Sequence, residues 1–283
     1  MKKKILLTLF TLALIILPFF IGIFLGKYSP YITTNSFQAY VTIWIFISLL
    51  FTLVLFLAIK FIHRSFRKTI LCGAVLLLLF CPIIGIVGLA APPDLSIKML
   101  DHPEREHLRY LFLFLAALIF GVFIFLLLRN NSVVIKPALK SIMAIVFFIA
   151  FAEFIWEFSH HYFYPEALKE WISKGKKAED FGKHYDNITI INIGVLGRFI
   201  QFSSILWLSI FLYKLRLIKI WHPIISFILC LLGIVSAIVI FITQFNIPKG
   251  FEILLLFFIP GFPFSLLYWL AVAILTKCKK TKL

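Results

Sequence analysis

The sequence predicts an all-α, polytopic integral membrane protein, a bundle of about eight transmembrane helices with both termini in the cytoplasm. The first observation is composition, since 62% of the 283 residues are hydrophobic and only 14% are charged. A soluble domain of this length cannot bury so much apolar surface, so long runs with almost no charge indicate membrane spans. The second observation is charge segregation, because cationic clusters without acids alternate with the segments that hold all 12 Asp and Glu residues.

Eight apolar stretches are long enough to cross about 30 Å of hydrocarbon as helices. They are continuously apolar, not alternating, which favours helices over membrane strands. We expect one transmembrane domain over residues 1–283, because neither of the longer connections, 92–109 and 160–189, is large enough to fold alone. The predicted spans cover approximately residues 5–26, 39–60, 70–91, 110–128, 138–159, 190–213, 222–244 and 252–276.

The first stretch follows Met1-Lys-Lys-Lys, as the apolar part of a secretory signal does. It is longer than the apolar part of a usual signal, and no Ala-x-Ala-like cleavage site follows it. We therefore expect an uncleaved first span.

Lysine and arginine set the predicted orientation. Short loops rich in these residues mark the cytoplasmic side of a membrane protein, so both termini are predicted to be cytoplasmic. The two longer connections, 92–109 and 160–189, then lie outside. The same rule accounts for the net charge of +16 without a nucleic-acid partner, since no basic folded domain remains to bind one. The acid-free cationic clusters lie within residues 2–4, 60–68, 129–140, 214–219 and 277–282.

The predicted location is a cell membrane, and the short Lys-rich loops are typical of a bacterial cytoplasmic membrane. The lipid bilayer is the partner that composition implies. The four cysteines lie in no metal-ligand spacing, so they indicate neither a disulfide framework nor a metal site. The sequence predicts no cofactor.

Prolines interrupt three predicted spans. Pro18 lies late in the first span and Pro82 in the middle of the third. The eighth contains Ile259-Pro-Gly-Phe-Pro263, in which two prolines bracket a glycine and remove backbone hydrogen bonds. We expect this helix to kink or break there, either as a packing feature or as a functional broken helix.

Polar residues concentrate at the outer end of the fifth span. Glu153, Glu157 and His160 are spaced i, i+4 and i+7, so they project from one helix face, with His161 at its edge. At about 1.5 Å per residue, Glu153 lies roughly 9 Å below the outer end of the span. A carboxylate at that depth is expensive unless it is paired, protonated or in water.

The sixth span offers a partner, because Arg198 lies at a similar depth and shares a face with Gly194, Gly197 and Gln201. Small residues on that face allow another helix to approach closely. We therefore predict a Glu153–Arg198 ion pair inside the bundle, either structural or functional. Glu157, His160 and His161 would lie above it, in the same site or simply in the headgroup region.

The outer connection before the fourth span adds Asp101-His-Pro-Glu104-Arg-Glu106-His107. His102 and His107 would reach the same outer mouth if spans three to six are neighbours. His184 and Asp186, in the other outer connection, are weaker candidates. None of these residues forms a compact metal-ligand spacing, so no metal ligand set is predicted.

Two short stretches resemble a known family. Glu104-Arg-Glu106-His107-Leu and Phe158-Ser-His160-His161-Tyr-Phe-Tyr, together with the order of spans from 70 to 213, are faintly similar to the lipoprotein intramolecular transacylases. These are small membrane enzymes with two outward-facing histidines. The resemblance implies a lipid-linked substrate in the outer leaflet. This chain departs from the family at Arg109, which stands where the family has an acidic residue, and it adds four flanking spans.

Three functions remain open at this point, and whether the protein is an enzyme is undecided. The leading hypothesis is a membrane-embedded enzyme that acts on a lipid or lipid-linked substrate from the outer leaflet. A proton-coupled transporter would instead use Glu153 as carrier, Arg198 as counter-charge and the broken eighth helix as gate; almost no polar residues are expected in the inner halves of the spans, which argues against it. A non-catalytic scaffold or subunit is the third. The enzyme hypothesis assigns Glu153 and Glu157 as acid or base, His107, His160 and His161 as base or nucleophile, and Arg198 and Gln201 as substrate-binding residues.

Overall fold

The computed structural model describes residues 2–26, 37–62, 68–80, 96–130, 135–259 and 261–277. Every regular element in these ranges is a helix, as the continuous apolar runs predict. Four of the helices are long and apolar enough to cross a membrane. They are α5 (Pro103–Arg129), α6 (Pro137–Tyr162, continued by α7, Tyr164–Ser173), α9 (Ile188–Lys214) and α10 (Trp221–Thr243).

The outward faces of these helices are as apolar as their packed faces. Phe125, Phe148, Leu196 and Ile242 are all more than half exposed. A helix that is hydrophobic all round belongs in a protein core or a membrane, and these side chains have no protein against them. The four helices therefore form a bundle suited to a membrane.

The first three predicted spans correspond to helices at one side of the bundle. α1 (Lys2–Gly26) continues past Pro18, and α2 (Phe37–Ile62) covers the second predicted span. α3 (Lys68–Leu78) covers the start of the third. The rest of that predicted span, with Pro82, lies outside the described residues.

The eighth predicted span is two helices, α11 (Leu254–Phe258) and α12 (Gly261–Lys277). Ile259 between them is extended, with ψ of 133°. The residue before a proline is pushed out of the helical region, and proline 260 follows directly. The predicted break is confirmed at this position.

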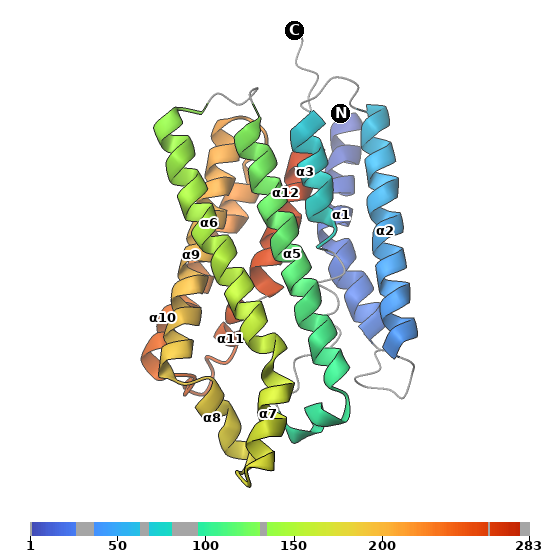
Figure 1. The fold of residues 1–283 in the computed structure, drawn as a ribbon. Coiled ribbons are helices and arrows are strands. Elements are labelled where there is room, and N and C mark those ends of the chain that lie inside the picture. Colours follow the sequence, from blue (N-terminus) through green and yellow to red (C-terminus); the bar gives the residue numbers. More distant parts are fainter. Residues whose placement is uncertain are drawn as a thin grey trace.

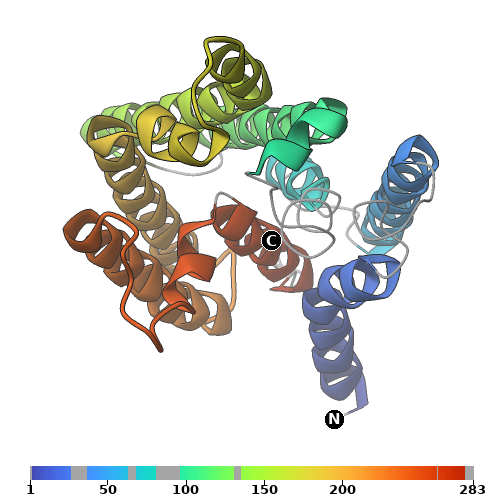
Figure 2. The ribbon, with the colours of Figure 1, turned by 90° about the horizontal axis from the view of Figure 1, so that it is seen from below.

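Successive long helices run in alternating directions, so the start of α1 and the end of α12 lie at the same end of the bundle (Figure 1). The opposite end is capped by α7 and by η2 (Ile97–Asp101), η3 (Ala178–Asp180) and α8 (Phe181–Tyr185). In the end-on view, α12 lies in the middle of the assembly (Figure 2). Its side chains are almost all buried, so α12 forms the centre of the main apolar core.

Candidate functional site

The candidate site lies where α6 packs against α9, toward the capped end of the bundle. α6 carries Glu153 and Glu157, one turn apart, and α9 carries Arg198 and Gln201, also one turn apart. Gly197 permits the close approach of the two helices, because a Cβ at this position would overlap the carboxylate of Glu153. The small residue on this face of α9 thus makes room for the acid, as its spacing predicted.

Arg198 is paired with Glu157 through both carboxylate oxygens. Arg198 Nη1 donates to Glu157 Oε2 at 2.7 Å, and Nη2 donates to Glu157 Oε1. Arg198 has no exposed surface and Glu157 only 5%, so the pair is shielded from solvent. A bidentate contact of this kind between guanidinium and carboxylate is both strong and geometrically specific.

The predicted Glu153–Arg198 ion pair is therefore wrong, although both residues are in the site. Helical side chains lean toward the N-terminus of their own helix, and α6 and α9 run in opposite directions. Arg198 therefore leans toward the capped end, whereas Glu153 leans away from it. Glu157 lies one turn nearer the cap and also leans away from it, so its carboxylate meets the guanidinium.

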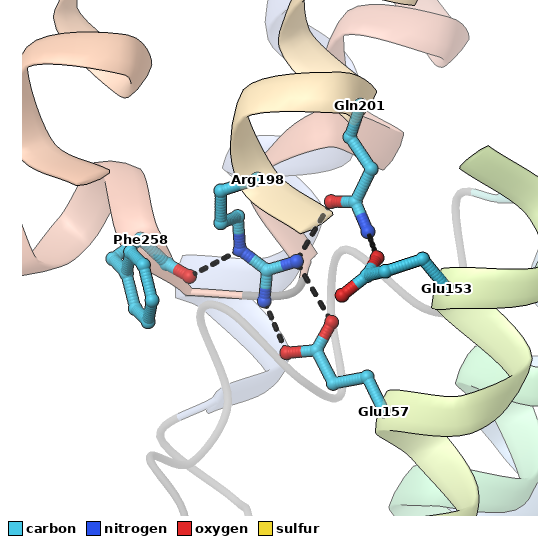
Figure 3. A network of polar contacts seen from close by, with 5 residues as sticks. All are labelled: Glu153, Glu157, Arg198, Gln201 and Phe258. Carbon is cyan, nitrogen blue, oxygen red and sulfur yellow. Dashed lines mark hydrogen bonds and ion pairs between the residues drawn. The ribbon is translucent and has the colours of Figure 1, made fainter. Parts of the chain in front are cut away.

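Gln201 connects Glu153 to this pair. Arg198 Nη1 donates to Gln201 Oε1 at 2.7 Å, and the Gln201 amide in turn donates to Glu153 Oε2 (Figure 3). The other carboxylate oxygen, Glu153 Oε1, is buried and has no hydrogen-bond partner among the described residues. Glu153 is thus a partly buried carboxyl, with one fully buried oxygen and no direct counter-charge.

The break in the eighth span supplies the last partner of Arg198. Arg198 Nε donates to the carbonyl oxygen of Phe258 at 2.7 Å, and the guanidinium lies 5.3 Å from the centre of the Phe258 ring. Phe258 is the last residue of α11, so its carbonyl has no intrahelical donor. Arg198 therefore ties α6 and α9 to the end of α11 (Figure 3).

His160 does not join this network. Its Nε2 lies 3.0 Å from Asp186 Oδ1, and its ring stacks on Tyr185 with centroids 4.3 Å apart. The Tyr185 hydroxyl donates to the His160 carbonyl at 2.7 Å. Burial, with the nearby charge of Asp186, raises the pKa of Tyr185 to about 12. His160 thus anchors α6 to the segment before α9.

The other two predicted histidines, His107 and His161, lie with His160 at the capped end of the bundle, which is the outer layer of the predicted orientation. His107 Nε2 is 2.8 Å from Glu166 Oε1, and the His107 ring stacks on Tyr162 at 4.7 Å. His161 stacks on Tyr110 at 5.2 Å and is within electrostatic reach of Glu157. The outer layer is thus a belt of histidine–aromatic stacks, in which His107 and His160 each have a carboxylate partner.

A buried polar cluster near the opposite end of the bundle was missed by sequence reasoning. His222 Nδ1 lies 2.8 Å from Ser209 Oγ and 3.3 Å from Ser226 Oγ, and its Nε2 lies 3.3 Å from the Leu266 carbonyl oxygen. The expectation that inner halves of the spans carry almost no polar residues is therefore wrong. The sequence pattern that could have revealed this cluster is helical spacing, because Ser209 lies three turns after Arg198 on the same face of α9.

The sequence also missed a second buried ion pair at the start of α5. Arg109 Nη1 lies 3.2 Å from Glu106 Oε2, and both side chains are buried. Their i, i+3 spacing is visible in the sequence, but no pairing between them was predicted.

Metal binding finds no support in the part of the chain that the structure describes, where no three His, Cys, Asp or Glu side chains are grouped closely enough to hold an ion. His102 is exposed and lies 3.2 Å from Glu104. His184 rests 4.5 Å from the ring of Trp171.

Fold and site together define a helical bundle suited to a membrane, with a buried charge network at a helix break. Comparison of the chain with protein-family models, with curated proteins and with solved structures gives no match. The function must therefore be argued from the geometry of the site.

Proposed function

We propose that the protein is a transporter of a bacterial cytoplasmic membrane, in which proton binding near Glu153 drives the movement of a solute. The proposal includes eight spans with both termini cytoplasmic. In its support, α1 and α2 have 25 and 26 residues, enough to cross a bilayer. The acid-free cationic clusters in the described residues also lie toward one end of the bundle, where the start of α1 and the end of α12 meet.

The observation that carries the proposal is the contact of Arg198 with the carbonyl at the helix break. The network contains two carboxyl groups and one guanidinium, so it is neutral only when one carboxyl holds a proton. Glu153 is the one without a direct counter-charge, and it is the proton-binding group in this proposal. Loss of its proton would leave a net negative charge in apolar surroundings, where an uncompensated charge is costly.

The way to relieve that charge is to move Arg198 toward Glu153, and this movement breaks its bond to the Phe258 carbonyl. α11 would then be released from α9 at the point where the eighth span is already interrupted. Broken helices at mid-membrane ion sites are a recurring device in transporters. Proton loss at Glu153 would thus be coupled to movement of α11.

The geometry also bears on the leading sequence hypothesis, the lipid enzyme with Arg198 as a headgroup ligand. Arg198 donates to Glu157, Gln201 and Phe258, which leaves its guanidinium occupied by protein acceptors. Binding an anionic headgroup would require breaking these bonds.

A second candidate function is nevertheless supported by the outer layer. His107 and His160 each lie within 3.0 Å of a carboxylate oxygen. A carboxylate partner orients an imidazole as a general base, the arrangement that a lipid-modifying enzyme would need. The substrate would then be a lipid or lipid-linked group in the outer leaflet.

Charge movement in proteoliposomes tests the transporter proposal. Vesicles containing the intact chain are adsorbed on a supported electrode and given a rapid pH jump, alone and with a panel of amino acids, sugars and organic anions. We expect a transient current that protein-free vesicles lack, and its loss in Glu153→Gln. Glu170→Gln is the matched control, since Glu170 is exposed and paired with Lys174. A current unchanged by Glu153→Gln would overturn the proposal.

The same preparation tests the enzyme. Vesicles of phosphatidylethanolamine and phosphatidylglycerol are incubated with the protein, and their lipids are analysed by mass spectrometry. New lipid products that disappear with His160→Gln, while Glu153→Gln retains them, would replace the transporter by the enzyme.

A further inference from the structure

We infer that His222 is a second proton-binding site, at the opposite end of the bundle from Glu153. Its protonation would control how tightly α9 and α10 are attached to α12 through the hydrogen bonds of this side chain. This inference rests on the proposed proton-coupled function and extends it to the inner half of the membrane.

His222 lies at a junction of three helices. It belongs to the first turn of α10, and its side chain is only 1% exposed. Ser209 of α9 lies 2.8 Å from Nδ1, and the Leu266 carbonyl of α12 lies 3.3 Å from Nε2. A carbonyl only accepts, so Nε2 carries the hydrogen, and Nδ1 accepts from the Ser209 hydroxyl. The imidazole is therefore neutral in this arrangement and has one nitrogen able to take a proton.

Proton uptake at Nδ1 changes the junction in a defined way. A protonated imidazole has two donors, so the hydroxyl of Ser209 must turn its hydrogen away and accept instead. The bond from Nε2 to the Leu266 carbonyl then becomes charge-assisted, which strengthens it. Protonation of His222 would therefore tighten the attachment of α12 to α10, and deprotonation would loosen it.

The broken eighth span is thus held at both of its halves by an ionisable group. Arg198 donates to the Phe258 carbonyl at the end of α11, and His222 contacts the Leu266 carbonyl in the second turn of α12. Proton loss at Glu153 would release the outer half, and proton loss at His222 would loosen the inner half. The contacts on the two sides of the helix break would respond to protons from opposite sides, as alternating access requires.

Buried polar side chains are spread along α9 from one site to the other. Arg198, Gln201, Ser204 and Ser209 are all buried. The hydroxyl of Ser204 has no hydrogen-bond partner in the described ranges, and neither does the buried indole nitrogen of Trp221, next to His222.

Few other titratable groups lie near His222, so a change of charge at this junction would be assigned to His222 itself. No hydrogen bond or ion pair connects His222 to another titratable group in the described part of the chain. At the inner end of α12, Lys277 Nζ donates to the Ile218 carbonyl at 2.6 Å. The remaining titratable side chains on the helices packed against His222 are Arg198, Tyr213 and Lys214 of α9, Cys230 of α10, and Tyr268 and Lys277 of α12.

Nitrogen NMR of the intact protein in lipid bilayers tests the inference. Histidine is labelled with ¹⁵N and leucine with ¹³C at the carbonyl, and the His222 signal is assigned through its dipolar coupling to Leu266. The assignment needs no variant, so it does not depend on a substituted chain folding. We expect the two ring nitrogens to pass from the neutral to the charged pattern on acidification. A His222 ring that stays neutral throughout the pH range in which the protein remains folded would overturn the inference.

The pH-jump current supplies the functional half of the test. We expect His222→Gln to abolish the current, whereas His184→Gln, at an outer-layer histidine beside Trp171, leaves it intact. If His222→Gln retains the full current while Glu153→Gln loses it, the second site is refuted and the proposed function stands. If neither variant alters the current, both are refuted.

Discussion

The Arg198–Glu157 pair provides the sharpest test of the site. Arg198→Met keeps much of the side-chain volume but removes every bond to Glu157, Gln201 and Phe258. Glu157 is then left buried without its counter-charge. Removing one member of a buried ion pair costs about 3–5 kcal/mol of folding free energy, and we expect a loss in this range. Glu157→Met should cost a similar amount, because it leaves the guanidinium uncompensated.

The double variant decides whether the cost comes from the unpaired charge. Replacing both members of a buried pair by apolar side chains is often neutral or stabilising. The Phe258 carbonyl still loses its donor, at about 1–3 kcal/mol. We therefore expect the double variant to be less destabilised than Arg198→Met alone. The free energy of unfolding is measured by titrating micelle-solubilised protein with sodium dodecyl sulfate and following tryptophan fluorescence.

Glu153→Gln is the internal comparison. Glu153 contacts Arg198 only through Gln201, so removing its charge should cost less than about 1 kcal/mol, or even stabilise the bundle. If Glu153→Gln proves the more damaging of the two glutamate substitutions, the sequence-predicted pair was right. If the two single losses simply add in the double variant, the residues are not a coupled pair at all.

Three further outcomes are expected. Gly197→Ala should destabilise the protein by about 1–3 kcal/mol in the same unfolding assay, because its Cβ overlaps Glu153, while Gly194→Ala, whose nearest neighbour is 3.9 Å away, should be near neutral; equal effects would contradict the close approach. Tyr185 has its pKa raised to about 12, above the value of about 10 for an exposed tyrosine, so its contribution to stability is complete below pH ~10 and lost as the pH rises toward 12. Ultraviolet titration should show one fewer late-ionising phenol in Tyr185→Phe, while Tyr164, whose pKa is also raised to about 12, remains; loss of a phenol that ionises near pH 10 would argue otherwise. Asp186→Ala should remove the anchor of His160 and speed amide hydrogen exchange in α7 and α8 without changing α9 or α10; unchanged exchange in α7 and α8 would show that the anchor is unnecessary.

The helical class and the break in the eighth span follow from local rules, and so the sequence predicts them. Continuous apolar runs leave only a helix, and Ile259 is forced out of the helical region by the proline after it. In the third predicted span, the described residues end at residue 80, and α3 covers the start of the span. The sequence predicts less well which helices lie side by side, because an apolar helix has no distinct face that identifies its neighbour.

The site was predicted as a set of residues but not as a set of contacts. Helical spacing placed Glu153 and Arg198 at similar depths and Glu157 above them, and the structure brings all three residues into one network. Which carboxylate meets Arg198 depends on the opposite lean of side chains on antiparallel helices, a shift of one turn that depth alone does not resolve. The contact between Arg198 and Phe258 spans 60 residues and needs the tertiary arrangement.

The central position of α12 bears on how the chain is assembled during synthesis. α12 follows α3, α5, α9 and α10 in the sequence, yet it fills the space between them. Until it leaves the ribosome, those helices face an empty centre, and His222 lacks its carbonyl partner, Leu266. The earlier helices are therefore expected to stay loosely packed until α12 joins them. A ribosome that stalls before residue 261 would leave behind a chain whose helices are formed but whose central core is unfilled.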